Sequence, residues 1–176
     1  YDPATDRWAS VASVPDDHMD ASGVWTGAEV LLWGGRRYGK AAEPLRSGHR
    51  YDPTSDEWAE IGVDGSPSPR YRHRSVWTGS EMIVIGGLDQ NVDFLTDGGR
   101  YDPAGDSWSS LAPPPVEPGS FFPQALWTGS DMLVFSVPDH DAPPSYEVVA
   151  LLYSPADDSW RFAAEAPADA ALDYED

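Results

Sequence analysis

Cationic side chains that could bind an anion are concentrated in two short stretches of the 176-residue sequence. Residues 36–40 read RRYGK, and residues 70–74 read RYRHR. A guanidinium group binds a carboxylate or sulfate through paired hydrogen bonds, so these arginines could hold an acidic sugar or another acid. The alternative is that they form ion pairs with acidic residues of the chain itself, such as Glu43 or Asp89. The candidate binding residues are Arg36, Arg37, Tyr38, Arg70, Arg72, His73 and Arg74.

Two phenylalanines are further candidates for ligand binding. Phe121 and Phe122 take the places in one part of the sequence that Tyr71 and Arg72 take in another. Aromatic rings at these positions could stack on a sugar, and packing in a hydrophobic core is the alternative interpretation.

No pattern of residues defines a metal or catalytic site. The run Pro138–Asp141 contains metal-ligand types, but a flexible acidic loop is the better interpretation. We assign the histidines at 18, 49 and 73 to different repeats, with no Ser or Asp at the spacing of a catalytic triad. We therefore predict no catalytic residue, no metal ligands and no cofactor. Paired aspartates could chelate calcium, although turn capping explains the first of each pair; the pairs are Asp2 and Asp6, Asp52 and Asp56, and Asp102 and Asp106.

These candidates lie within a sequence that repeats about every 50 residues. The string Tyr-Asp-Pro-x-x-Asp-x-Trp begins at positions 1, 51 and 101, and a changed copy, YSPADDSW, occupies 153–160. A second motif, Trp-Thr-Gly, alternates with the first and begins at positions 25, 77 and 127. Repeats of this length are typical of solenoids, propellers and arrays.

Each repeat has the pattern of four short antiparallel strands. The Thr-Gly pair predicts a tight hairpin, and the apolar runs that follow it predict strands buried on both faces. These runs are Val30–Trp33, Met82–Ile85 and Met132–Phe135. The Tyr-Asp-Pro motif predicts a second hairpin, in which the Asp side chain caps backbone amides and Pro fixes φ. We expect its Tyr and Trp rings to pack between successive sheets, and four strands per repeat describe a β-propeller blade.

The sequence resembles Kelch-repeat proteins over about residues 1–165. The resemblance depends on the glycine doublets Gly34-Gly35 and Gly86-Gly87, each followed by a Tyr and then, seven residues later, by a Trp. It departs from the pattern where Ser136 and Val137 replace a doublet. The resemblance implies an all-β propeller with about three and a half blades: a half blade at 1–12, blades at about 18–63, 70–112 and 121–163, and an acidic tail at 166–176.

Three and a half blades do not close a ring of the Kelch type. We expect that the chain is a piece of a longer polypeptide, that further subunits complete the ring, or that this is an unusual open or small propeller. Residue 1 lies inside a repeat and is not Met, so we expect the natural N-terminus to lie elsewhere.

Composition narrows the possible partners. The net charge is −19, from 30 acidic and 11 basic residues, which argues against nucleic acid and anionic membranes as partners. No apolar run is long enough to span a bilayer. The absence of cysteine excludes disulfides, thiolate metal sites and the Cys–Tyr cofactor of the copper galactose oxidases that some Kelch proteins resemble. For the compartment, we favour an extracellular or cell-surface location.

Meander geometry places both kinds of turn at one end of the sheets and the longer connections at the other. These connections, at 36–47, 88–98 and 138–147 within blades and at 13–20, 64–73 and 113–122 between blades, differ in length and composition. Varied loops on a rigid scaffold commonly carry binding sites.

We therefore predict a non-catalytic Kelch-type binding or scaffold module that recognises a protein or glycan through these loops. One alternative is a carbohydrate-active enzyme that resembles the Kelch sialic-acid mutarotases, with Arg70, Arg72 and His73 as the candidate residues. The other is a purely structural repeat segment of a larger surface protein.

Overall fold

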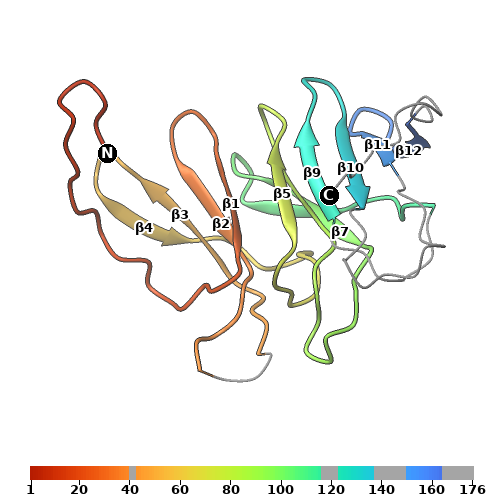
Figure 1. Ribbon diagram of the computed structural model, residues 1–176, viewed down its shortest axis with the longest axis horizontal. Coiled ribbons are helices and arrows are strands. Elements are labelled where there is room, and N and C mark those ends of the chain that lie inside the picture. The colour runs from red at the N-terminus through yellow and green to blue at the C-terminus, as the bar shows by residue number, and fades with distance from the viewer. Residues whose placement is uncertain (40–42, 116–122, 137–149, 164–176) are drawn as a thin grey trace, which may run out of the picture.

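The computed structural model describes residues 1–39, 43–115, 123–136 and 150–163, and within these ranges the fold is all-β (Figure 1). Its twelve strands form three four-stranded antiparallel sheets. The first sheet contains β1 (Ser22–Trp25), β2 (Val30–Trp33), β3 (Gly48–Asp52) and β4 (Glu57–Glu60). The second contains β5 (Arg74–Trp77), β6 (Met82–Ile85), β7 (Gly98–Asp102) and β8 (Ser107–Ser110). The third contains β9 (Pro123–Trp127), β10 (Met132–Ser136), β11 (Ala150–Ser154) and β12 (Ser159–Phe162).

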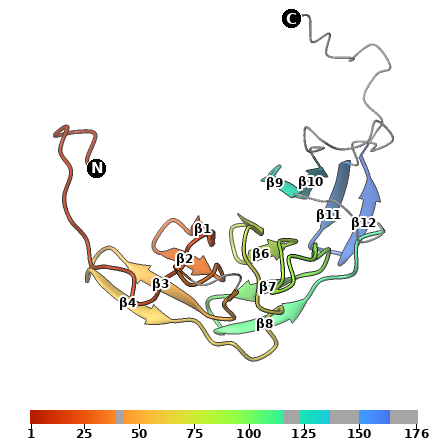
Figure 2. The same ribbon diagram turned by 60° about the horizontal axis from the view of Figure 1, so that its bottom comes forward.

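The three sheets are propeller blades arranged as an arc. In each sheet the strands follow one another in chain order. Figure 2 shows the sheets fanned about an open centre, with β4 and β8 along the outer rim and β1 and β9 nearer the centre. The inner strand β5 contacts both β1 and β9. The prediction of an all-β fold of four-stranded propeller blades that do not close a ring is therefore confirmed for the described residues. No helix in the described ranges has the length and apolar character needed to cross a bilayer.

The connections between strands lie at two distinct ends of the sheets, which we call the turn end and the loop end. The turn end carries the Trp-Thr-Gly and Tyr-Asp-Pro turns and is uppermost in Figure 1, with the loop end below. In the first Trp-Thr-Gly turn, the Thr26 hydroxyl accepts hydrogen bonds from the amides of Ala28 and Glu29. Gly27 follows with a φ of 103°, a left-handed conformation that favours glycine. The Thr-Gly pair therefore determines the hairpin, as the sequence predicted.

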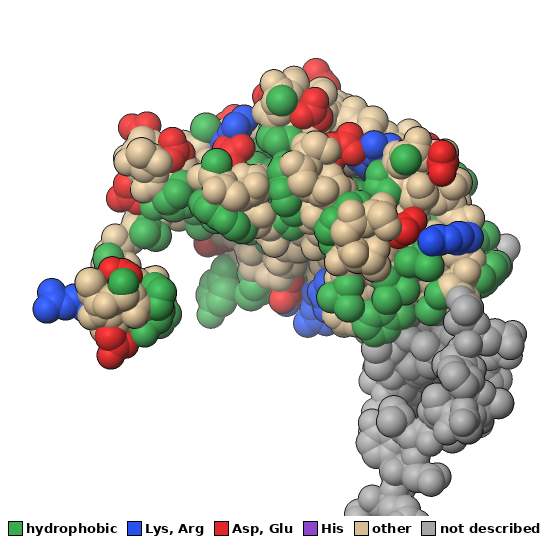
Figure 3. Space-filling model, turned by 90° about the horizontal axis from the view of Figure 1, so that it is seen from above, with side chains coloured by type: hydrophobic (Ala, Val, Ile, Leu, Met, Phe, Trp, Pro, Cys, Tyr) green, Lys and Arg blue, Asp and Glu red, His purple; other side chains and the backbone are tan. Residues whose placement is uncertain are grey.

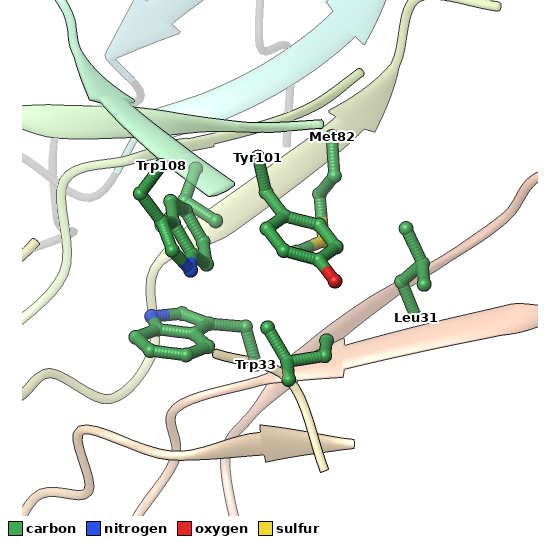
Figure 4. Packing of buried hydrophobic residues seen from close by; sticks show 7 residues of the cluster. Leu31, Trp33, Met82, Tyr101 and Trp108 are labelled. Atoms are coloured by element: carbon green, nitrogen blue, oxygen red, sulfur yellow. The ribbon is translucent and has the colours of Figure 1, made fainter. Parts of the chain in front are cut away.

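Apolar residues fill the spaces between neighbouring sheets. Between the first two sheets, Leu31 and Trp33 of β2 face Met82, Tyr101 and Trp108 (Figure 4). The rings of Trp33 and Trp108 lie 4.4 Å apart between centroids, an arrangement that stabilises beyond the area it buries. Strand β6 is buried along its whole length, because alternate side chains face the first and third sheets.

Three of the four copies of this motif, those that begin at 51, 101 and 153, also hold the backbone that leaves the preceding blade, in an arrangement we call a clamp. The Tyr101 hydroxyl and the Gly62 amide both donate to Asp106 Oδ1, at 2.7 and 2.9 Å. Trp108 Nε1 donates to the Gly62 carbonyl at 2.8 Å. Two further clamps repeat these bonds: Tyr51, Asp56 and Trp58 hold Ala12, and Tyr153, Asp158 and Trp160 hold Ala112. The expected role of the Tyr and Trp rings between sheets is confirmed.

The two aspartates of the motif have different roles. Asp52, the first, accepts the Thr54 amide at 2.7 Å, which is the predicted turn cap. Asp56, the second, has a φ of 57° and bonds a different part of the chain, the amide of Ala12. We did not predict this second role from the sequence. In the described structure, these carboxylates hold backbone amides.

The first copy of the motif forms a turn that holds no linker. Asp2 pairs with Arg7, and the Tyr1 hydroxyl donates to Asp6 at 2.8 Å, as in the clamps. Trp8, however, is 83% exposed, and no backbone segment among the described residues bonds to it or to Asp6. Figure 3, which looks onto the turn end, shows this N-terminal turn standing apart from the sheets.

Candidate binding face at the loop end

Backbone hydrogen bonds at the loop end bring the two arginine-rich stretches together. Met19 and Arg36 pair with each other through both backbone groups, at 3.1 and 2.8 Å. The Arg72 amide donates to the Asp20 carbonyl at 2.8 Å, and the Gly35 amide donates to the Arg70 carbonyl at 2.9 Å. The linker before β1, the loop after β2 and the linker before β5 therefore form one continuous framework.

Within this framework, Arg36 and Arg72 share one carboxylate, and we call these two residues the arginine pair. Arg36 Nε lies 2.8 Å from Asp20 Oδ2, and Arg72 Nε lies 3.6 Å from the same oxygen. The Arg36 guanidinium also lies over the Tyr71 ring, 5.1 Å from its centroid, which holds it by a cation–π contact. Two guanidinium groups facing one carboxylate leave a net positive charge, and the Arg72 side chain is 50% exposed.

Arg70 is a structural residue, which corrects its assignment to a binding site. Its side chain is fully buried. Nε donates to the Ser68 carbonyl, Nη1 donates to the Gly86 and Asp97 carbonyls, and Nη2 donates to Ser68 Oγ and Asp97 Oδ1. A guanidinium has five N–H donors, so none remains for a ligand.

His73 is likewise an interior residue, and it is not a cationic ligand-binding group. It is 1% exposed, and neither ring nitrogen has a hydrogen-bond partner among the described residues. Burial, and then the charge of Arg70, lower its pKa to about 3, so the ring is neutral at physiological pH. A Cβ at Gly34 would lie 2.7 Å from His73 Cε1, and one at Gly87 would lie 2.9 Å from His73 Cβ. Gly34 thus leaves space for the ring of His73, and Gly87 leaves space for its Cβ.

The remaining candidates do not join the arginine pair. Arg37 lies 3.7 Å from Glu43, as the ion-pair alternative proposed, and Tyr38 is 78% exposed. Arg74, on β5, lies 3.4 Å from Gln124 Oε1 of the third sheet. Asp89, the other suggested partner, instead caps its own loop by accepting backbone amides. Phe121, Phe122 and the run Pro138–Asp141 lie outside the described residues.

A pocket of about 360 Å³ opens between the loops of the first two blades. It is formed by the loop after β2, the linker before β5 and the loop after β6. Its lining combines two acidic side chains with prolines and a leucine; the residues are Glu43, Pro44, Ser68, Pro69, Asp89, Gln90 and Leu95. The loops that the sequence indicated for binding therefore do surround a cavity.

The structure also brings together two histidines that the sequence analysis assigned to different repeats. His18 Nε2 lies 3.0 Å from His49 Nδ1, and His18 Nδ1 lies 2.6 Å from the Gly34 carbonyl. Both residues belong to the first blade, one in the linker before β1 and the other on β3. Their separation of 31 positions matches no short metal or catalytic motif, so the spacing carried no signal.

Comparison with known proteins supports the same architecture. Residues 69–115 match the family model of the Kelch motif. The fold matches 139 chains of solved structures, among them the structure of YjhT, with a TM-score of 0.67 and 16% sequence identity. That match covers 89% of this chain and 54% of YjhT, so the chain spans about half the length of that protein. None of the curated proteins compared with this chain matches it.

The fold is that of a β-propeller. The chain carries a Kelch motif on that fold, which confirms the resemblance seen in the sequence.

Proposed function

We propose that this chain is a non-catalytic Kelch-type binding module that recognises an acidic group of a protein or glycan at the loop end. The Kelch repeat and the propeller fold support a binding or scaffold module in general. The observation that carries the finer proposal is the arginine pair, in which Arg36 and Arg72 share Asp20.

Arg72 is the member of the pair that is suited to bind a ligand. Its contact with Asp20 is 3.6 Å long, and the side chain is half exposed. An exposed ion pair of this kind contributes little to stability, roughly 0–1 kcal/mol, so an incoming carboxylate or sulfate can compete for the guanidinium. Arg36 is held in place by Asp20 and Tyr71 and adds a fixed positive charge beside it.

We prefer binding to catalysis because of the positions of the residues that the enzyme alternative would use. The enzyme hypothesis, based on resemblance to sialic-acid mutarotases, relied on Arg70, Arg72 and His73. All five donors of Arg70 are used within the fold, and His73 is buried and neutral. Arg72 alone remains accessible, and a single arginine can bind an acid but supplies no general base.

Calorimetric titration with a panel of acidic sugars and acidic peptides tests this proposal. We expect at least one acidic probe to bind, and Arg72→Ala to abolish that binding while the melting temperature stays within a few degrees of the unchanged protein. The matched control is Arg161→Ala, because Arg161 is 56% exposed and also contacts one aspartate, Asp131, but lies at the turn end. Binding that is lost equally in both variants, or no binding to any acidic probe, would contradict the proposal.

A further inference from the structure

Asp16, His18 and His49 place three metal-ligand atoms close together at the loop end of the first blade. One carboxylate oxygen and one nitrogen from each imidazole all lie within 4.8 Å of one another. Asp16 and His18 belong to the linker before β1, and His49 lies on β3, where it is 3% exposed. Asp16 is exposed, so the cluster runs from the interior to solvent.

The hydrogen bond from His18 to Gly34 determines which nitrogen of His18 can bind a metal. A carbonyl oxygen only accepts, so the proton must be on Nδ1, which lies 2.6 Å from the Gly34 oxygen. In the neutral ring, Nε2 then carries the lone pair, and it is directed toward His49. An imidazole whose other nitrogen donates to a backbone carbonyl is the usual arrangement for a metal-ligating histidine.

The second blade shows what occupies the equivalent place there. Tyr71 pairs with Leu88 as Met19 pairs with Arg36, so Arg70 is the structural counterpart of His18. Each donates to the carbonyl of the first glycine of its doublet, Arg70 to Gly86 at 3.1 Å.

The neighbours of Arg70 extend this correspondence. Ser68, the counterpart of Asp16, accepts from Arg70 at 2.9 Å, and Gly99 is the counterpart of His49. The second blade therefore places a guanidinium cation among backbone and side-chain acceptors. The first blade has two imidazoles and a carboxylate in the same place.

We propose that Asp16, His18 and His49 bind one divalent transition-metal ion, with Zn²⁺ as the probe. The ligands are His18 Nε2, His49 Nδ1 and an Asp16 carboxylate oxygen, and the remaining position faces solvent. Two imidazoles and one carboxylate are a ligand set that zinc uses when a fourth position is left to water or another ligand. On binding, the His49 proton resides on Nε2, which frees Nδ1 for the metal.

Zinc titration of the metal-stripped protein by calorimetry tests the site. We expect one Zn²⁺ per chain, and we expect Asp16→Asn to weaken binding by about tenfold or more, the size of effect seen when a metal site loses a supporting group. The matched control is Asp17→Asn, which removes the same charge from the adjacent exposed residue and should leave the zinc affinity unchanged. Because Asp16 is exposed, its replacement does not disturb the core.

Two further measurements distinguish zinc coordination by these three residues from non-specific attraction of cations to an acidic surface. Mg²⁺ should not compete with Zn²⁺, because imidazole ligands favour transition metals. His18→Gln should remove zinc binding and also the rise in melting temperature that zinc causes in the unchanged protein. Equal weakening by Asp16→Asn and Asp17→Asn, competition by Mg²⁺, or no stoichiometric zinc binding would overturn the proposal.

Discussion

The turn end and the loop end of the sheets repeat in different ways. At the turn end, three clamps have the same residue types, the same hydrogen bonds and the same left-handed aspartate. At the loop end, the first two blades share their backbone pairing, but the side chains on that framework differ. His18 occupies the place of Arg70, and Asp20 occupies the place of Arg72.

The pair formed by Asp20 and Arg72 illustrates this difference. Both residues have a left-handed φ, at 59° and 56°, so they are equivalent in backbone conformation. They carry opposite charges and contact each other across neighbouring blades. Residues that recur at the turn end are explained by packing and hydrogen bonding. At the loop end, some positions have equivalent backbone conformations in two blades but carry different side chains. These positions are therefore the ones to test for function.

The largest expected effect compares a filled clamp with the unfilled one. Trp108→Ala removes a ring that packs on Trp33 and bonds Gly62, and should lower the free energy of unfolding by about 3–5 kcal/mol. Trp8 occupies the same position of the motif in the first copy, where the ring is exposed. Trp8→Ala should therefore change the free energy of unfolding by less than about 0.5 kcal/mol. Urea denaturation followed by circular dichroism measures both, and equal losses would show that the clamp is not what stabilises the sheets.

An intermediate effect is expected from His73 on acidification. Its pKa is lowered to about 3 in the folded chain, so the unfolded chain binds a proton at higher pH and stability falls as pH drops below the ordinary value of 6.5. Between pH 7 and pH 5 the loss from this residue should be about 2 kcal/mol. His73→Leu removes no hydrogen bond and should reduce the slope of stability against pH in this range. An identical slope in the variant would contradict a buried, neutral His73.

The clamps should respond at lower pH in the same denaturation series. The Tyr101 hydroxyl and the Gly62 amide lower the pKa of Asp106, and the Tyr153 hydroxyl and the Ala112 amide do the same for Asp158. A lowered pKa means that the stabilisation is present above the ordinary value of 3.8 and is lost as pH falls through the folded value. The acid response should therefore have two stages, first from the loop end and then from the turn end.

Much of the fold could be predicted because its determinants lie close together in the sequence. A few consecutive residues determine the Thr-Gly turns, the turn cap formed by Asp52 and the buried strand β6. The Tyr and Trp rings were also expected between sheets, since large aromatic residues that recur in every repeat suit a repeated interface.

The details of the site were harder to predict because they depend on distant segments. Arg70 and Arg72 are two positions apart and chemically identical, yet one is fully buried and the other half exposed. Arg70 bonds Asp97 and the Gly86 carbonyl, whereas Arg72 contacts Asp20. The second aspartate of each clamp was missed for the same reason, because its partner is an amide 44 or 46 positions earlier in the chain.

Binding at the loop end can be tested directly by an NMR titration that follows the side-chain Nε–H signals of the arginines as an acidic probe, such as glucuronate, is added. We expect shifts for Arg36 and Arg72 at the loop end. We expect none for Arg50 and Arg100, which are held by Glu29 and Glu81 in the repeated framework of the turn end. Shifts confined to Arg50 and Arg100 would contradict the assignment of binding to the loop end.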